Sequence, residues 1–125
     1  MALTHLMIID DSEADQFLCQ LTAEDFNPDM QIQQAYNGAE ALQMLASGSN
    51  LPQAILLDIN MPIMNGFEFL EEFQQHYPDA AVVVSILSSS SHKADQEKAA
   101  TYPCVKLYLK KPVTEGSLRE LQALI

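Results

Sequence analysis

Five short apolar runs recur along the chain, and a stretch with helical periodicity follows each of them. The runs lie at residues 6–9, 30–36, 54–57, 80–87 and 105–109. Three of them, at 6–9, 54–57 and 80–87, are almost free of polar side chains, which is typical of strands buried on both faces of a parallel sheet. The run at 30–36 alternates and suits an edge strand. The pattern therefore predicts an α/β fold with helices on both faces of a parallel sheet.

The helix after the first run is predicted to begin after Ser12, whose hydroxyl can cap it, and to end near Pro28. Its apolar residues at helical spacing predict the face that packs on the sheet, and they are Ala14, Phe17, Leu18 and Leu21. A short fourth helix is expected at 94–102. The other predicted core faces are Ala39, Leu42, Leu45 and Ala46 in the second helix, Phe67, Leu70, Phe73 and Tyr77 in the third, and Leu118, Leu121 and either Leu124 or Ile125 in the last.

This alternation predicts a doubly wound five-stranded parallel sheet with the flavodoxin-like strand order 2-1-3-4-5. At 125 residues, with 48% hydrophobic and 18% charged residues, the chain is expected to form a single domain over residues 1–125. No apolar run approaches the roughly 20 residues that span a membrane, and no signal peptide is evident, so a cytoplasmic location without membrane attachment is expected.

The formal charge of -11 disfavours direct binding of nucleic acid and favours proteins or cations as partners. The two cysteines, Cys19 and Cys104, lie far apart in the sequence and are interpreted as small apolar residues. The three histidines share no metal-ligand spacing.

Polar side chains follow four of the five apolar runs, at the point where each predicted strand ends. Asp10 and Asp11 follow the first run, Asp58 the third, Ser88 the fourth and Lys111 the fifth. Because the carboxyl ends of parallel strands meet at one edge of a sheet, these side chains are expected to lie together. Ser88 opens a run of four serines, which composition alone would explain as a loop, but its place at this edge favours a functional role.

Three crowded carboxylates repel one another unless a cation is present, and a hard divalent ion such as Mg²⁺ resolves the repulsion. A metal-bound carboxylate beside a hydroxyl and an ammonium is suited to accept a phosphoryl group, with the Asp58 oxygen as the nucleophile. The alternative is that Asp58 merely ends a strand or caps a helix. It does not explain why four predicted strands all end in side chains suited to this chemistry.

These residues resemble a known family, the receiver domains of two-component response regulators, also called the CheY-like family. The resemblance covers essentially the whole chain. Its motifs are the pair Asp10 and Asp11, the segment with Asp58, Met61, Pro62 and Gly66, the hydroxyl of Ser88, and the pair Lys111 and Pro112.

The resemblance implies that Asp58 is the phosphoacceptor and that Asp10, Asp11 and Asp58 hold Mg²⁺ together with the main-chain carbonyl of Asn60. It also implies that Ser88 and Lys111 contact the phosphoryl group, and that Tyr108 is the aromatic switch residue. Lys110 is the alternative for the lysine role, but the residue immediately before proline matches better. The segment 101–104 departs from the family's usual Gly-Ala pair, which predicts a different shape near the fourth helix.

The sequence thus predicts a phosphorylation switch that accepts a phosphoryl group on Asp58 from a sensor histidine kinase or phosphotransfer protein and then binds a downstream target protein. Turnover of a separate substrate is not expected. The fourth helix, fifth strand and fifth helix are predicted to form the signalling surface. One alternative is a magnesium-dependent phosphatase that uses an aspartyl-phosphate, but such enzymes carry an aspartate two residues after the nucleophile, where this chain has Asn60. The other is a pseudo-receiver, a binding module without the chemistry.

Overall fold

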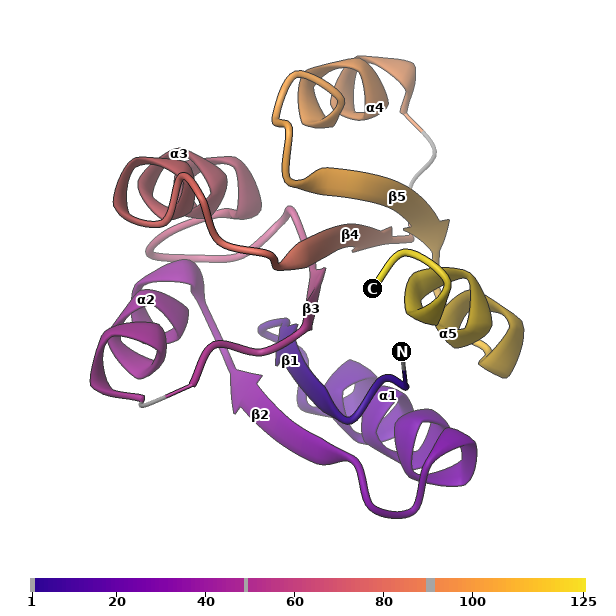
Figure 1. The fold of residues 1–125 in the computed structure, drawn as a ribbon. Coiled ribbons are helices and arrows are strands. Elements are labelled where there is room, and N and C mark those ends of the chain that lie inside the picture. Colours follow the sequence, from indigo (N-terminus) through magenta and orange to yellow (C-terminus); the bar gives the residue numbers. More distant parts are fainter. Residues whose placement is uncertain (1, 49, 90–91) are drawn as a thin grey trace.

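The computed structural model describes residues 2–48, 50–89 and 92–125, in which five strands alternate with five helices. The strands are parallel and lie in the order β2-β1-β3-β4-β5, as predicted (Figure 1). The elements, in chain order, are β1 His5–Ile9, α1 Glu13–Phe26, β2 Gln31–Ala35, α2 Gly38–Ser47, β3 Ala54–Leu57, α3 Gly66–His76, β4 Val83–Ser88, α4 Lys93–Ala99, β5 Val105–Lys110 and α5 Glu115–Gln122. None of the helices in these ranges is both long and apolar enough to cross a bilayer.

Helices cover both faces of the sheet, so the apolar core is divided into two layers. Figure 1 shows α1 beside α5 on one face and α2 beside α3 on the other. The first layer places Leu118 and Leu121 of α5 against β1 and β3, and the second places Phe69 and Phe73 of α3 against the opposite face. The central strands β1 and β3 are buried almost completely, which explains why their sequences carry no polar residue beyond His5.

The prediction for the core face of α1 was wrong. Ala14 is exposed, and Phe17, Leu18 and Leu21 are 56%, 50% and 46% exposed. The buried residues of α1 are instead Gln16, Cys19 and Ala23, which recur at helical spacing on the opposite side of the helix.

The cause of this rotation is a hydrogen-bonded glutamine. The side-chain amide of Gln16 donates to the carbonyl oxygens of Ile8 (3.1 Å), Asp10 (3.1 Å) and Ala35 (2.8 Å). These bonds satisfy backbone acceptors at the ends of β1 and β2 and turn α1 so that small side chains face the sheet. Each such hydrogen bond contributes about 0.5–1.5 kcal/mol, so together they are comparable with the gain from burying one more apolar side chain, about 1.5–3 kcal/mol.

Smaller differences affect the other helices. In α2, Leu45 is buried and Leu42 partly buried as predicted, but Ala39 and Ala46 are exposed. In α3, Leu70 and Phe73 are fully buried, while Phe67 and Tyr77 pack at the margin of the core. After α5 the chain buries Ile125 in part and leaves Leu124 45% exposed, which resolves the alternative left open by the sequence.

The approach to β5 is irregular. The register between β4 and β5 shifts near Ser85. Tyr102 is buried there, and its hydroxyl donates a 2.9 Å hydrogen bond to Glu71 of α3. The turn after α4 is thereby tied to α3.

Candidate functional site

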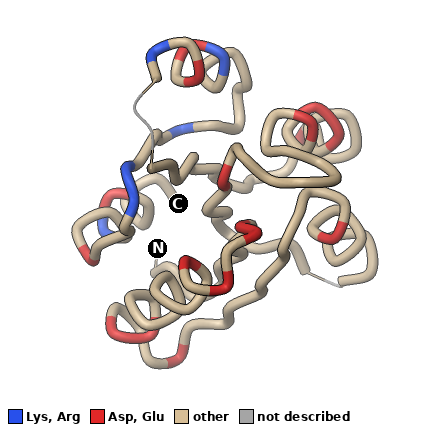
Figure 2. The backbone as a smooth tube through the Cα atoms, turned by 180° about the vertical axis from the view of Figure 1, so that it is seen from behind, with Lys and Arg blue, Asp and Glu red and all other residues tan. Residues whose placement is uncertain are grey.

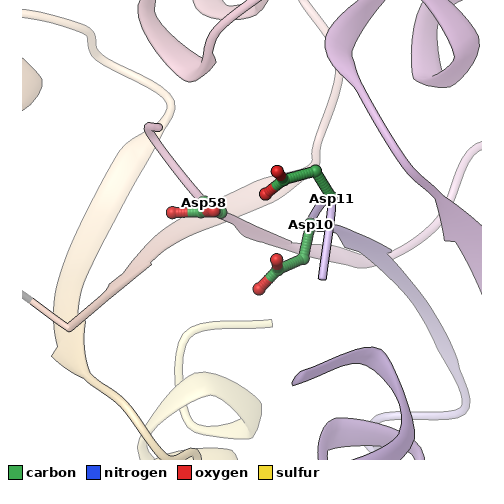
Figure 3. Close-up of side chains that lie close together, drawn as sticks. All are labelled: Asp10, Asp11 and Asp58. Carbon is green, nitrogen blue, oxygen red and sulfur yellow. The ribbon is translucent and has the colours of Figure 1, made fainter. Parts of the chain in front are cut away.

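Three aspartates meet where β1 and β3 end (Figure 3). The N–H of Asp58 donates to the carbonyl oxygen of Ile9 (2.9 Å), which continues the pairing of β1 and β3 by one residue and places Asp58 beside Asp10. One carboxylate oxygen from each of Asp10, Asp11 and Asp58 lies within 4.8 Å of the others. Asp10 and Asp58 are buried and Asp11 is exposed, so the cluster opens to solvent on one side.

The loop after β3 is folded tightly over Asp58. The N–H of Gly66 donates to the carbonyl oxygen of Ile59 (2.9 Å), and a Cβ at Gly66 would lie 2.7 Å from the carbonyl oxygen of Asp58. A contact that short requires a residue without a side chain. Asn65 and Glu68 then form a capping box that begins α3. The backbone around Asp58 is therefore fixed from both sides.

Asn60 lies two residues after Asp58 and is exposed. Its N–H faces the Asp58 carboxylate, with 3.4 Å between the nitrogen and Oδ1. The predicted role of its carbonyl oxygen as a metal ligand stays a prediction.

Lys111 brings a positive charge into this cluster. Its Nζ lies 2.8 Å from Asp10 Oδ2, 2.7 Å from Asp15 Oδ2 and 3.8 Å from Asp58 Oδ2. Burial on its own would lower the pKa of Lys111, but the hydrogen bonds to Asp10 and Asp15 raise it above its usual value. The side chain is therefore an ammonium at neutral pH. Lys110, the alternative, is exposed and forms no ion pair with the aspartates in the described part of the chain.

Asp15 is the site residue that the sequence analysis missed. It lies in the first turn of α1, four residues after Asp11, rather than at the end of a strand. The available indication was that spacing, because one helical turn places Asp15 back over the edge at which the helix begins.

Ser88 and Tyr108 occupy the neighbouring strands. Ser88 is buried at the end of β4, and its carbonyl oxygen accepts a 2.8 Å hydrogen bond from the N–H of Lys111. Tyr108 lies opposite Ile86 in β5 and is half-buried. Its hydroxyl oxygen is buried without a hydrogen-bond partner among the described residues. Of the serine run, Ser90 and Ser91 lie outside the described residues.

Burial raises the pKa of Asp58 to about 6, with Lys111 opposing the shift and Asp10 and Asp11 adding to it. The cluster thus holds carboxylates that repel one another and that Lys111 compensates only in part. Carboxylate oxygens are the ligands that Mg²⁺ prefers, and one or two of them with several waters complete its coordination. The donor set and its unbalanced charge therefore fit this ion.

The chain belongs to the response regulator receiver domain family, because the sequence model of that family matches residues 6–123. A two-component response regulator from Cytophaga hutchinsonii has a similar structure, with a TM-score of 0.88 and 31% identity over 97% of this chain and 95% of that one. Receiver domains generally bind Mg²⁺ in an acidic pocket, and they interact with histidine kinases and downstream effectors.

Two curated relatives differ in how much of their length this chain covers. PilH of Pseudomonas aeruginosa is 27% identical over 116 residues, which are 93% of this chain and 92% of PilH. The sensor histidine kinase CheAY of Helicobacter pylori is 29% identical over 107 residues, which are 86% of this chain and 13% of CheAY. The chain spans between 13% and 31% of the length of the first curated relatives that it matches.

Proposed function

We propose that this chain is a phosphorylation switch in which Asp58 accepts a phosphoryl group from a phosphohistidine of a sensor histidine kinase or phosphotransfer protein. The observation that carries the proposal is the meeting of Asp58 with two further aspartates and Lys111 at one open edge of the sheet. The modified chain then changes its affinity for a downstream protein.

The transfer forms one bond and breaks one. An Asp58 carboxylate oxygen attacks the phosphorus, and an oxygen–phosphorus bond forms as the phosphorus–nitrogen bond of the phosphohistidine breaks. The electron pair of the broken bond stays on the imidazole nitrogen, and a histidine that carries its proton on the other nitrogen leaves neutral. With a pKa of about 6, Asp58 is largely ionised at neutral pH and needs no separate base.

The surrounding side chains stabilise charge on the transferred group. The ammonium of Lys111, 3.8 Å from Asp58, pairs with a phosphoryl oxygen, and the hydroxyl of Ser88 donates a hydrogen bond to another. Asp10, Asp11, Asp58 and the carbonyl of Asn60 would hold Mg²⁺. When bound, the ion supplies positive charge to the phosphoryl oxygens.

The exposed apolar face of α1 fits a docking role for the phosphodonor protein. Phe17, Leu18 and Leu21 leave large side chains in solvent on the helix that begins next to Asp11. Leu18 also lines a groove of about 340 Å³ together with Lys111 and Pro112. Apolar patches of this kind mark protein interfaces, and this one lies beside the nucleophile that a donor must reach.

The signalling surface is proposed to be α4, β5 and α5. Every Lys and Arg of the chain lies between Lys93 and Arg119, and the five other than the site residue Lys111 lie on α4, β5 and α5 of an otherwise acidic protein (Figure 2). An acidic target surface is the complementary partner. Tyr108 of β5 connects this surface to the site, because β5 pairs with the strand that ends in Ser88.

The two alternative functions are less well supported. A phosphatase acting on small molecules needs a general acid two residues after the nucleophile, and the amide of Asn60 is not acidic enough to serve as one. A pseudo-receiver without the chemistry does not account for the ion pairs that hold a lysine beside Asp58.

The deciding experiment is incubation of the protein with a small phosphodonor and Mg²⁺, followed by mass spectrometry. A single phosphoryl adduct that hydroxylamine removes is expected, because hydroxylamine cleaves acyl phosphates and leaves phosphoserine intact. A stable adduct, or none at all, would exclude the proposed function.

A further inference from the structure

Asp15 contacts Lys111 more closely than the phosphoacceptor does. The Lys111 ammonium lies 2.7 Å from Asp15 Oδ2 and 3.8 Å from Asp58 Oδ2. An ammonium has three N–H donors; one of them donates to Asp15 Oδ2, and Asp10 Oδ2, 2.8 Å from Nζ, forms an ion pair with the ammonium. Asp58 Oδ2, at 3.8 Å, lies beyond hydrogen-bond distance of the ammonium.

The position of Asp15 is set by the backbone rather than by the ion pair itself. Its N–H donates to the hydroxyl of Ser12, which caps α1, and the next residue, Gln16, fixes the helix to three carbonyl groups at the ends of β1 and β2. The Asp15 carboxylate is therefore presented to Lys111 by a first turn that is already anchored. Because the main chain of this turn is already ordered, the pair forms without further loss of backbone entropy, which favours a persistent contact.

We propose that Asp15 is a positioning residue that holds Lys111 away from Asp58 and competes with the phosphoryl group for the ammonium. This inference rests on the proposed function. Lys111 must turn toward Asp58 to contact a phosphoryl oxygen, and each such contact weakens its pairing with Asp15. Asp15 thereby lowers the stability of the phosphorylated state and determines how large the response to phosphorylation is.

Removal of the Asp15 charge should change the affinities for Mg²⁺ and for beryllofluoride in opposite directions. Without the Asp15 charge, Lys111 keeps its ion pair with Asp10 and turns toward Asp58, where it competes with Mg²⁺, so Mg²⁺ binds more weakly. With Mg²⁺ saturating, the freed ammonium pairs more readily with an anion on Asp58, so the phosphoryl mimic beryllofluoride binds more tightly. For a partly exposed ion pair the expected change is about two- to fivefold in each affinity. Damage to the fold would instead weaken both ligands.

The experiment measures both affinities by NMR titration of the full chain in wild type, Asp15→Asn and the matched control Glu13→Gln. Glu13 is an exposed carboxylate in the same helical turn and forms no ion pair in the described part of the chain, so its loss reports the general effect of one charge. Asp15→Asn should weaken the binding of Mg²⁺ and strengthen the binding of beryllofluoride, and each change should be larger than that caused by Glu13→Gln. Asp15→Glu keeps the charge and should return both affinities toward wild type.

A double-mutant cycle tests whether Asp15 acts through Lys111. In a Lys111→Met background, Asp15→Asn should change Mg²⁺ affinity no more than Glu13→Gln does. If Asp15→Asn changed Mg²⁺ affinity as much in the Lys111→Met background as it does with Lys111 present, the inference would be overturned. It would also be overturned if the wild type bound beryllofluoride but Asp15→Asn and Glu13→Gln changed the two affinities equally. Failure of the wild type to bind beryllofluoride with Mg²⁺ would overturn the proposed function, and the inference with it.

Discussion

The N–H of Lys111 donates a 2.8 Å hydrogen bond to the carbonyl oxygen of Ser88. This bond extends the pairing of β4 and β5 past the last residue of β5. The two residues proposed to contact the phosphoryl group are thus fixed to one another through the main chain. Their side chains can then change partners while the separation of the two strands stays constant.

Asp58→Asn should abolish labelling by a small phosphodonor, because the amide is not a nucleophile toward phosphorus. Mass spectrometry of the intact protein measures the adduct. The same variant lacks one of the repelling carboxylates, so its free energy of unfolding without metal should rise, by about 1–3 kcal/mol. Labelling of Asp58→Asn at the wild-type rate would make Asp10 or Asp11 the acceptor.

Millimolar Mg²⁺ should raise the melting temperature of the wild type, since the ion binds the folded cluster and not the unfolded chain. At ten times the dissociation constant the gain is about 1.4 kcal/mol. Asp11→Ala should reduce this gain, and because Asp11 is exposed the substitution removes little packing. An unchanged melting temperature across the whole titration would argue against a cation site.

Cys19 should be alkylated much more slowly than Cys104 in the folded protein, because Cys19 is buried and Cys104 only partly buried, although burial raises the pKa of both thiols. Burial, reinforced by Asp10, raises the pKa of Cys19 to about 12 from 9.0, and the thiolate is the reactive form. Iodoacetamide at pH 8 and peptide mass spectrometry compare the two thiols in one sample. Equal modification of both would contradict the burial of Cys19.

The same shift has a consequence for stability in alkaline solution. The pKa of Cys19 in the folded protein lies above its value in the unfolded chain. The contribution of Cys19 to the free energy of unfolding is therefore intact below pH 9 and is lost as the pH rises from 9 toward 12. The free energy of unfolding of Cys19→Ala should therefore fall less steeply over that interval. If the free energies of unfolding of wild type and Cys19→Ala fell equally steeply over this pH range, the raised pKa would not belong to Cys19.

Phe17→Ser should slow phosphoryl transfer from a protein donor about tenfold or more and leave labelling by a small phosphodonor unchanged, since only the protein donor needs the α1 face. Leu124→Ser is the matched control, because Leu124 is a similarly exposed apolar residue that follows α5. Loss of both reactions in Phe17→Ser, or equal slowing in Leu124→Ser, would count against docking on α1.

Beryllofluoride with Mg²⁺ should shift amide NMR signals well beyond the site. If the modification draws the Ser88 hydroxyl toward Asp58, the space opened beside β4 is available to Tyr108, whose buried hydroxyl lacks a partner among the described residues. Changes are expected at Ser88 and Ser89, at 107–111 and at 92–102, and none in Asp58→Asn. Shifts restricted to the loops around Asp10 and Asp58 would exclude a switch through Tyr108.

The strand order and the edge that carries Asp10, Asp58 and Lys111 could be predicted because short apolar runs define buried parallel strands, and the residue after each run lies at a known edge. The rotation of α1 could not. Periodicity places large apolar side chains inward, and here a buried hydrogen bond from Gln16 decides the orientation. Asp15 was missed for a related reason, since its contact with Lys111 depends on that same rotation.

Gly66 places a limit on the sequences that this fold accepts. Its Cα lies so close to the Asp58 carbonyl that even one methyl group would have to displace the loop carrying the phosphoacceptor. A library with every amino acid at this position should therefore retain glycine alone among functional clones. Its neighbour Ile63, 82% exposed in the same loop, should accept many replacements, and most readily glycine or asparagine, because its backbone φ of 68° is one that β-branched residues avoid. Thus one loop contains both a position with no freedom to vary and one whose natural residue is not its most stable choice.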